Sequence, residues 1–459
     1  MHKPKPSCLA LLPILALLLP LTASAASDRV ADLLAIPGSA GLGVMLRSEQ
    51  SPYKDARISN DLVPMYLYEG KRAFLHGTRA GLKLVDEERH RVDLFLDYRF
   101  EGYPYDPTPA SLAGMRTRRP SSSLGLGYRY RANWGNLDSE ILEDADNVSK
   151  GAELRLGYSV DWQSGPWHLR PGLMVSRRNA SLNNYYYGVR EEEVTPLRPA
   201  YLPGAGTDLW LGINGYYELS KRWRLLGAVG VNLLDPKVRS SPVVRDGAQP
   251  TVMVGAAYDF GNHESYSVPG QPLHVKVLYG RSTDCNLLPV MTLRCGSTRT
   301  EDNTRIAAVE LGRPLIERVN NWPLDFVGYI GVLHHDENQI QRDSWQFDAY
   351  IKAYYYGFPW SEHVRTRLGM GGGFSLAQRV PYVEERDQAK RGRNTSKLLN
   401  YLDPSVDISI GDVIGSRSLK ETYFGLGVAH RSGIFGTARL FGNINGGSNY
   451  IYTYIETKL

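Results

Sequence analysis

Two side chains near the carboxyl end of the chain have types and spacing suited to hydrolytic chemistry. His430 ends an alternating segment that contains Phe424, Leu426 and Val428, and Ser432 follows two residues later. Residues two apart in a β-strand share a face, so both polar groups lie on the apolar face. An imidazole beside a hydroxyl can take its proton, and an anionic third group normally orients that imidazole. The alternative is a structural His and Ser at an aromatic-rich rim, without chemistry.

Long alternating segments must position this pair. Residues 92–101, 124–131 and 152–162 alternate apolar residues with charged residues or glycine. About ten residues at period two is the length that a tilted strand needs to cross a bilayer. An apolar outer face with a polar inner face is typical of an outer-membrane β-barrel. The alternative is a large soluble β-sandwich, which would have shorter strands and would not explain aromatic residues at strand ends.

Composition supports the same class of protein. The chain has 459 residues, with 29 Tyr and 46 Gly, and this enrichment suits antiparallel β structure with aromatic belts. A formal net charge of +5 is mild for this length and argues against a dedicated nucleic-acid binder. The sequence indicates no cofactor.

The amino-terminal residues have the features of a signal peptide. Lys3 and Lys5 precede an apolar stretch at 9–21, and Ala23-Ser24-Ala25 is a small-x-small cleavage site. We therefore predict that residues 1–25 are removed. A retained anchor helix is the alternative, which the prolines at 13 and 20 disfavour.

Export places the two remaining cysteines, Cys285 and Cys295, in an oxidising compartment. Their short separation, within a segment between two strands, predicts a disulfide that staples a loop. Two free thiols are the alternative.

The predicted fold is all-β, with transmembrane antiparallel β-barrels of about ten and then eight strands. A single barrel of about eighteen strands is the alternative and would leave a wide lumen. The strands predicted before residue 262 are 41–47, 62–68, 72–84, 91–101, 121–132, 151–163, 167–177, 207–219, 222–234 and 250–261. The strands predicted after it are 271–281, 304–313, 322–334, 345–357, 364–377, 399–412, 418–430 and 449–459.

The connections of the second set alternate between long and short, as expected for external loops and periplasmic turns. This rhythm puts His430 near the external end of the seventh strand. The Pro- and Arg-rich stretch 102–120 interrupts the alternation of long and short connections in the first set. The sequence does not show whether this stretch lies outside the cell, in the periplasm or in the lumen.

Two polar groups fall in predicted external loops of the second set. His334 and His335 are adjacent, so they cannot both reach one metal ion without help, and we predict no metal site there. Lys390, Arg391 and Arg393 form a basic run. At the outer leaflet this run could contact the phosphates of lipopolysaccharide, for which Arg is well shaped. A solvated loop is the alternative.

The first half resembles the MipA/OmpV family. The residues that carry the resemblance are 184–193 (Asn-Tyr-Tyr-Tyr-Gly-Val-Arg-Glu-Glu-Glu), 198–201 (Arg-Pro-Ala-Tyr) and 204–206 (Gly-Ala-Gly), followed by 216–219 and 223–225. The similarity extends loosely over about 38–262 and ends at Tyr258-Asp259-Phe260. It implies an outer-membrane barrel, and some members are proposed scaffolds that link murein hydrolases to murein synthases.

The second half, about 271–459, resembles PagL-type lipid A 3-O-deacylase, an eight-stranded outer-membrane barrel with lipid-facing catalytic residues. The family's His-x-Ser matches His430 and Ser432, and its Asn-x-Gly-x-Glu matches 445–449, so Asn449 stands at the catalytic Glu position. The Asn that usually follows the serine is Gly433 here. An amide can orient a histidine but cannot offset imidazolium charge, and this replacement in a serine protease costs about 10⁴ in rate. Glu456 is an odd number of residues from Asn449, so it lies on the opposite face of the strand and cannot replace the missing catalytic Glu.

The sequence therefore predicts a signal peptide (1–25), a MipA/OmpV-like barrel region (26–262) and a PagL-like barrel region (263–459). The first functional hypothesis is an envelope scaffold with an interaction role at the cell surface, with murein-processing enzymes and outer-membrane lipid or lipopolysaccharide as partners. The second is a hydrolase of acyl esters in lipid A or another outer-leaflet lipid, with a variant site made of His430, Ser432 and Asn449.

Overall fold

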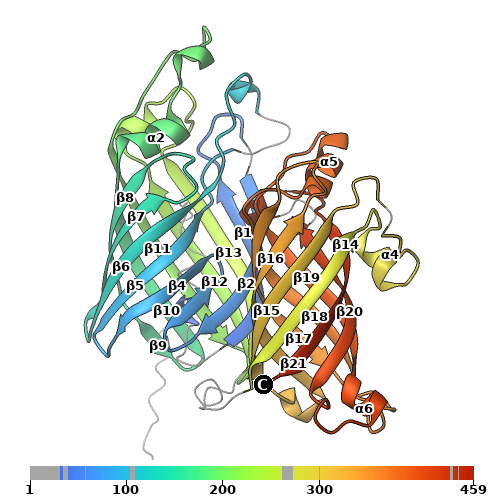
Figure 1. The fold of residues 1–459 in the computed structure, drawn as a ribbon. Helices are drawn as coiled ribbons and strands as arrows, with labels where there is room; N and C mark the ends of the chain where they lie inside the picture. The colour runs from blue at the N-terminus through green and yellow to red at the C-terminus, as the bar shows by residue number, and fades with distance from the viewer. Residues whose placement is uncertain are drawn as a thin grey trace, which may run out of the picture.

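The chain forms two closed β-barrels that stand side by side (Figure 1). The structure is a computed structural model. It describes residues 32–34, 40–56, 58–103, 109–260, 272–298, 300–434, 438–442 and 444–459. The two-barrel prediction is confirmed, and the single barrel of about eighteen strands is wrong. The predicted signal peptide, 1–25, lies outside the described residues.

The first barrel is an antiparallel sheet that closes through pairing of β10 with β11. Short β9 pairs only with β10, so twelve strands form the wall. The strands are β1 (Ala40–Gln50), β2 (Ile58–Glu69), β3 (Ala73–His76), β4 (Arg79–Asp86), β5 (His90–Arg99), β6 (Ser121–Ala132), β7 (Gly135–Asp144), β8 (Ala152–Ser159), β9 (Trp162–Ser164), β10 (Trp167–Arg178), β11 (Gly206–Glu218), β12 (Trp223–Leu233) and β13 (Ala248–Asp259).

The second barrel closes through pairing of β14 with β21. Its eight strands are β14 (His274–Ser282), β15 (Arg305–Ile316), β16 (Leu324–Asp336), β17 (Ser344–Tyr355), β18 (Thr366–Ala377), β19 (Leu398–Ser409), β20 (Thr422–Ser432) and β21 (Asn449–Lys458). Each overlaps one of the eight strands that the alternation predicts.

The predicted count of about ten strands for the first barrel is corrected to twelve by two differences. β7 was not predicted, because acidic residues occupy both of its faces and weaken the alternation. The predicted strand 72–84 is instead the hairpin of β3 and β4, which turns at Gly77 with a φ of +61°. A positive φ is readily adopted by glycine and ends the strand there.

Helices lie in the connections between strands (Figure 1). The end with long connections carries η1 (Ala110–Leu112), α2 (Ala180–Tyr187), η2 (Glu191–Glu193), α3 (Pro236–Arg239), α4 (Leu287–Met291), α5 (Tyr382–Lys390) and η6 (Arg439–Phe441). The opposite end carries η4 (Val319–Asn321) and α6 (Ile410–Ile414). Long loops of outer-membrane barrels are external, so the α2 and α5 end is the external one.

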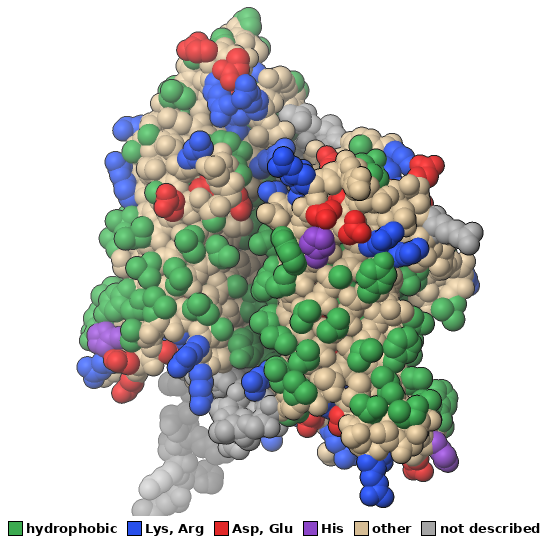
Figure 2. All heavy atoms as spheres, in the orientation of Figure 1, with side chains coloured by type: hydrophobic (Ala, Val, Ile, Leu, Met, Phe, Trp, Pro, Cys, Tyr) green, Lys and Arg blue, Asp and Glu red, His purple; other side chains and the backbone are tan. Residues whose placement is uncertain are grey.

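The outer surfaces of both barrels carry an apolar band between charged ends (Figure 2). In β5, for example, Leu94 and Leu96 point outward and are exposed, whereas Asp97 points inward and is buried. Exposed tryptophans mark the periplasmic end of the first barrel, as expected where a wall meets the membrane interface: Trp134, Trp162, Trp167 and Trp223. None of the helices in the described segments is long and apolar enough to span a bilayer.

The two barrels contact each other through β1, β2 and the end of β13 on one side and through β15 to β19 on the other. The Tyr66 hydroxyl donates a 2.9 Å hydrogen bond to Asn400 Oδ1. The rings of Phe260 and Phe326 lie 4.3 Å apart. Side chains that would otherwise face lipid are therefore buried between the barrels.

The wall of the first barrel is incomplete where it contacts the second barrel. β3 has only four residues, and it pairs with residues 67–69 of β2. In the described part of the chain, residues 58–65 of β2 therefore pair with β1 but have no strand partner on their other edge. The lumen-facing residues of β1 and β2 at this level are apolar: Met45, Val63 and Met65. They share one apolar cluster with loop residues of the second barrel, which are all buried: Ala438, Leu440, Phe441 and Ile444. We call residues 438–442 and 444 the wedge; its helix η6 contacts both β2 and β19.

Candidate functional site

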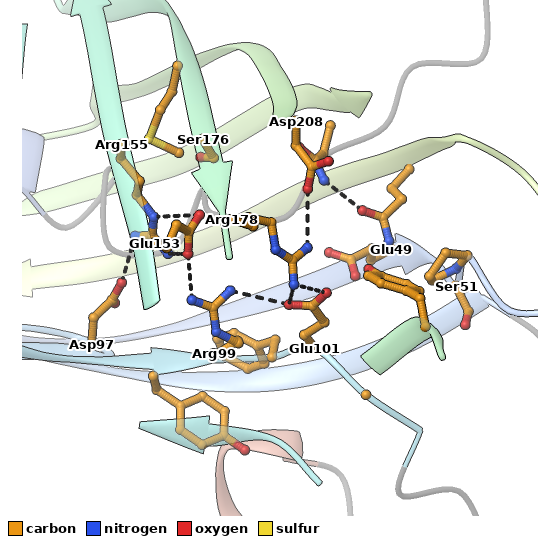
Figure 3. A pocket seen from close by; sticks show the side chains of 18 of the residues that line it. Glu49, Ser51, Asp97, Arg99, Glu101, Glu153, Arg155, Ser176, Arg178 and Asp208 are labelled. Carbon is orange, nitrogen blue, oxygen red and sulfur yellow. Dashed lines mark hydrogen bonds and ion pairs between the residues drawn. The ribbon is translucent and has the colours of Figure 1, made fainter. Parts of the chain in front are cut away.

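Ion pairs cross the lumen of the first barrel near its external end (Figure 3). Arg178 donates to Glu101 at 2.7 Å and to Asp208 at 3.1 Å. Arg99 joins Glu101 at 3.2 Å to Glu153 at 2.5 Å. Glu101 follows the end of β5, and the other side chains come from inward positions of β5, β8, β10 and β11. A cavity of about 80 Å³ remains among them.

The external loops of the first barrel form a cap over this lumen with a small apolar core. The core residues come from four loops: Tyr53, Ala56, Tyr103, Leu112, Leu182, Tyr186, Tyr187, Val189, Leu234, Val238, Val243 and Val244. The side chain of Asn179 accepts a hydrogen bond from Leu182 N and thereby starts α2. The motif that carries the MipA/OmpV resemblance thus supplies α2 and its neighbours, and Tyr187 lines the cavity below.

A buried ion pair holds two loops of the cap together. Arg118 donates to both carboxylate oxygens of Glu193, at 2.9 and 2.6 Å, and both side chains are almost fully buried. Arg198 also donates to the Ser111 and Ala113 carbonyl oxygens. The stretch that the sequence left unplaced, 102–120, is therefore part of the external cap where the structure describes it.

Burial acts to raise the pKa of Glu193. Hydrogen bonds from the Arg118 guanidinium and from the backbone N–H groups of Arg190 and Arg116 outweigh that effect, so the pKa of Glu193 is lowered. The carboxylate is thus held in its charged form within the cap.

The periplasmic half of the first lumen is also filled. Asp32, which precedes the barrel in sequence, accepts hydrogen bonds of 2.7 Å from Arg129 and from Arg170. A second cavity beside it has a volume of about 40 Å³. A segment from before the first strand therefore reaches into the barrel and bridges two lumen arginines.

The lumen of the second barrel is packed with buried charges and tyrosines. The Lys276 ammonium lies 3.0 Å from Glu310 and 3.2 Å from Asp403, and Lys352 lies 2.6 Å from Asp403. Tyr452 donates a hydrogen bond to Asp403. Eight strands leave room only for side chains, and these side chains fill it.

The residues of the predicted hydrolytic site lie on the outer face near the external rim. His430 and Asn449 are cross-strand neighbours in β20 and β21, and His430 Nδ1 lies 2.6 Å from Asn449 Oδ1. Ser432 Oγ accepts a hydrogen bond from Ile434 N at 3.1 Å. In the described residues, no hydrogen bond joins Ser432 to His430. Glu456 points into the lumen, where Arg367 donates to it at 2.9 Å.

The predicted lipopolysaccharide contacts are at the external end. Lys390 ends α5, and Arg391 follows it at the surface. Arg393 donates a 2.8 Å hydrogen bond to the Asn445 carbonyl oxygen. The basic run thus lies beside the loop that connects β20 with β21, and its contact with lipopolysaccharide stays a prediction.

Two further sequence features have defined positions. Cys285 and Cys295 form a disulfide with their Cα atoms 5.9 Å apart. His334 points outward and its ring contacts Trp345, whereas His335 points inward and lies 3.0 Å from Gln346 Oε1. The adjacent histidines thus lie on opposite faces of β16.

Comparisons with known proteins concern mainly the first barrel. Residues 40–260 match the family model described as MltA-interacting protein MipA. The outer membrane protein Omp26La of Vibrio anguillarum is 30% identical over 160 residues, 35% of this chain and 62% of Omp26La. The MltA-interacting protein of Escherichia coli K12 is 24% identical over 225 residues, 48% of this chain and 88% of that protein.

The chain thus spans about 62% of the length of Omp26La, and the same holds for OmpV of Vibrio cholerae, at 29% identity. Among solved structures, the copper transporter OprC can be superposed on this chain with a TM-score of 0.23 and 10% sequence identity. The superposition covers 92% of this chain and 81% of the OprC chain. That likeness is too low to support an argument.

Closed β walls with apolar outer faces and charged interiors define the class of protein. This chain is an outer-membrane β-barrel protein and is located in the bacterial outer membrane. Its first barrel, residues 40–260, belongs to the MipA/OmpV family. The resemblance of 271–459 to the PagL-type deacylase stays a prediction.

Sequence reasoning did not identify the lumen network or the cap as candidate sites. The charged inward positions were visible in the alternation, but the pairing of Arg178 with Glu101 and Asp208 joins residues from three separate strands and loops. The tyrosine-rich stretch at 184–187 was the one signal of the cap.

Proposed function

We propose that this protein is a non-enzymatic interaction protein of the outer membrane, which binds a murein-processing enzyme at its periplasmic end. The observation that supports this most is that buried ion pairs cross both lumens, Arg178 with Glu101 and Asp208 in the first barrel and Lys276 with Glu310 and Asp403 in the second. A filled barrel offers its surfaces, rather than a conduit, for function. The name of the Escherichia coli relative, MltA-interacting protein, suggests the class of partner.

The periplasmic connections of the second barrel provide a surface of suitable character. Val413 and Ile414 on α6 are exposed, as are Trp322 and Trp360 in the neighbouring connections. Arg365 Nε donates to Asp412 at 2.9 Å and holds the start of α6 at the end of the barrel. Exposed aliphatic and aromatic side chains at a rigid position are typical anchors of protein interfaces.

The test is retention of purified MltA by the full-length protein in detergent micelles. The wild type should retain MltA, and the double substitution Val413→Ser with Ile414→Ser should reduce retention at least tenfold. Leu197→Ser, which changes an exposed leucine of the external cap, is the matched control and should bind like the wild type. Failure of the wild type to retain MltA would sink the proposal.

One observation favours a second candidate, the outer-leaflet acyl-ester hydrolase. The 2.6 Å contact of His430 with Asn449 has the arrangement that orients an imidazole. In the described part of the chain, however, no hydrogen bond joins Ser432 to His430, so the interaction function is preferred. Mass spectrometry of lipid A would decide: identical lipid A from cells that express wild type, Ser432→Ala or no protein would exclude the hydrolase.

A further inference from the structure

The disulfide-stapled loop between β14 and β15 leans over the outside of the second barrel. It carries α4, which projects from the side of the barrel, whereas α5 lies over the end (Figure 1). Its start is fixed at two points: Thr283 N donates to the Asn449 carbonyl oxygen at 3.0 Å, and Arg386 of α5 donates to Asp284 at 2.7 Å.

One side of this loop packs on the lipid-facing wall. Phe424, Leu426 and Val428 share the outer face of β20, yet their exposed fractions are 44%, 51% and 6%. Val428 is buried because Cys285 and Val290 of the loop cover it. The loop therefore lies against the wall at Val428, which is the next outward-facing residue of β20 after Leu426. This position is at the external edge of the apolar band.

The other side of the loop is apolar and uncovered. Leu288 is 69% exposed and Leu293 is 94% exposed, and Met291 is also exposed. Exposed Arg294 follows directly. Contact of several large apolar side chains with water is unfavourable at about 25 cal/mol per Å². The opposite side of the loop rests on residues that face lipid. We therefore infer that the uncovered side also faces lipid.

We propose that residues 285–295 form an anchor inserted at the acyl-chain boundary of the outer leaflet, with the acyl chains of outer-membrane lipids as its partner. Short apolar segments with a flanking cation bind at this depth, where the apolar side chains enter the acyl region and the cation meets lipid phosphates. The disulfide and the contacts of Asp284 hold the segment against the wall. The anchor thereby covers the lipid-facing surface next to His430 and Asn449, and it does not depend on either proposed function.

The test is photo-crosslinking in cells that express the full chain. The photoreactive amino acid p-benzoylphenylalanine replaces Leu288 or Leu293 in separate variants. Leu426 on the wall is the lipid-facing reference, and Leu197 in the external cap of the first barrel is the exposed reference. All four side chains are at least half exposed, so their replacement leaves the packed interior unchanged.

We expect positions 288 and 293 to form lipid adducts with yields like that of position 426 and at least fivefold above that of position 197. The adduct mass distinguishes lipid A from a glycerophospholipid, and either source supports the anchor. The proposal would be overturned if position 426 formed lipid adducts while the yields at positions 288 and 293 were no higher than the yield at position 197.

Discussion

The hydroxyl of Tyr66 in the first barrel donates a 2.9 Å hydrogen bond to Asn400 Oδ1 in the second. Both residues occupy outward positions, where a lone barrel would present them to lipid. A hydrogen bond between two polar groups in an apolar surrounding is costly to break, because neither group finds water. This pair therefore ties the barrels together at a defined register.

Tyr66→Phe should weaken the association of the two barrels by about 1–2 kcal/mol, because Asn400 loses its partner in a buried position. A protease site inserted between Phe260 and Pro272 allows the halves to be separated after purification in detergent. The halves of the variant should dissociate roughly tenfold faster than those of the parent. Tyr279→Phe, on the exposed face of β14, is the control, and equal dissociation rates for both variants would contradict this role of Tyr66.

Phe441→Ala should loosen the wedge that fills the gap beside β2. Phe441 is fully buried, so its removal leaves a cavity, which typically costs about 3–5 kcal/mol. Cysteine labelling of a Val63→Cys background reports the gap, because Val63 faces the apolar cluster behind the wedge. Labelling should increase several-fold with Phe441→Ala. The exposed Phe424→Ala is the matched control, and unchanged labelling would show that the wedge does not close the wall.

Arg118→Lys should open the external cap without unfolding the barrel. A lysine cannot reproduce the two-pronged contact with Glu193, and the buried carboxylate would lose hydrogen bonds that it needs. We expect a loss of about 1–3 kcal/mol in cap stability, because the buried carboxylate keeps a cationic neighbour but loses charge-assisted hydrogen bonds. Limited proteolysis of the loop at 179–205 measures it. Arg116→Lys is the control, because its pair with Glu192 lies at the surface and contributes little.

The strands were predictable from the sequence because a barrel wall imposes period two on every residue. Leu94 and Asp97 could be assigned to opposite faces without any knowledge of their neighbours. β7 shows the limit of that signal: its acidic residues pair with lumen arginines such as Arg79 and Arg129, so polar side chains are stabilised where the pattern alone gave no strand.

The sites were less predictable, because they depend on contacts between segments without periodicity. Phe441 gives no sign in sequence of its place beside Val63, and the position of 102–120 follows from the pairing of Arg118 with Glu193. The adjacency of His430 and Asn449 was predicted from a resemblance, and strand pairing brings them together.

We call the external loops around α5 the cap of the second barrel. The caps of the two barrels should respond to pH in opposite directions, because two buried carboxyl groups have opposite pKa shifts. Burial raises the pKa of Glu337, beside α5, more than hydrogen bonds from Gln341 and the Tyr382 N–H lower it. A raised pKa in the folded state gives stability that is present below the unfolded value of about 4.3 and is lost as pH rises through the folded pKa. The lowered pKa of Glu193 gives stability that is present above the unfolded value and is lost as pH falls through the folded pKa.

Hydrogen exchange, corrected for the intrinsic pH dependence of amide exchange, measures both caps in one sample. Between pH 7 and pH 4, amides of α5 should become better protected, and amides of the loop at 179–205 should become less protected. Glu337→Gln mimics the protonated carboxyl group and should remove the pH dependence of α5 while leaving that of the other loop intact. Glu193→Gln should expose its own loop at every pH. A parallel response of the two caps would contradict the assignment of these carboxyl groups.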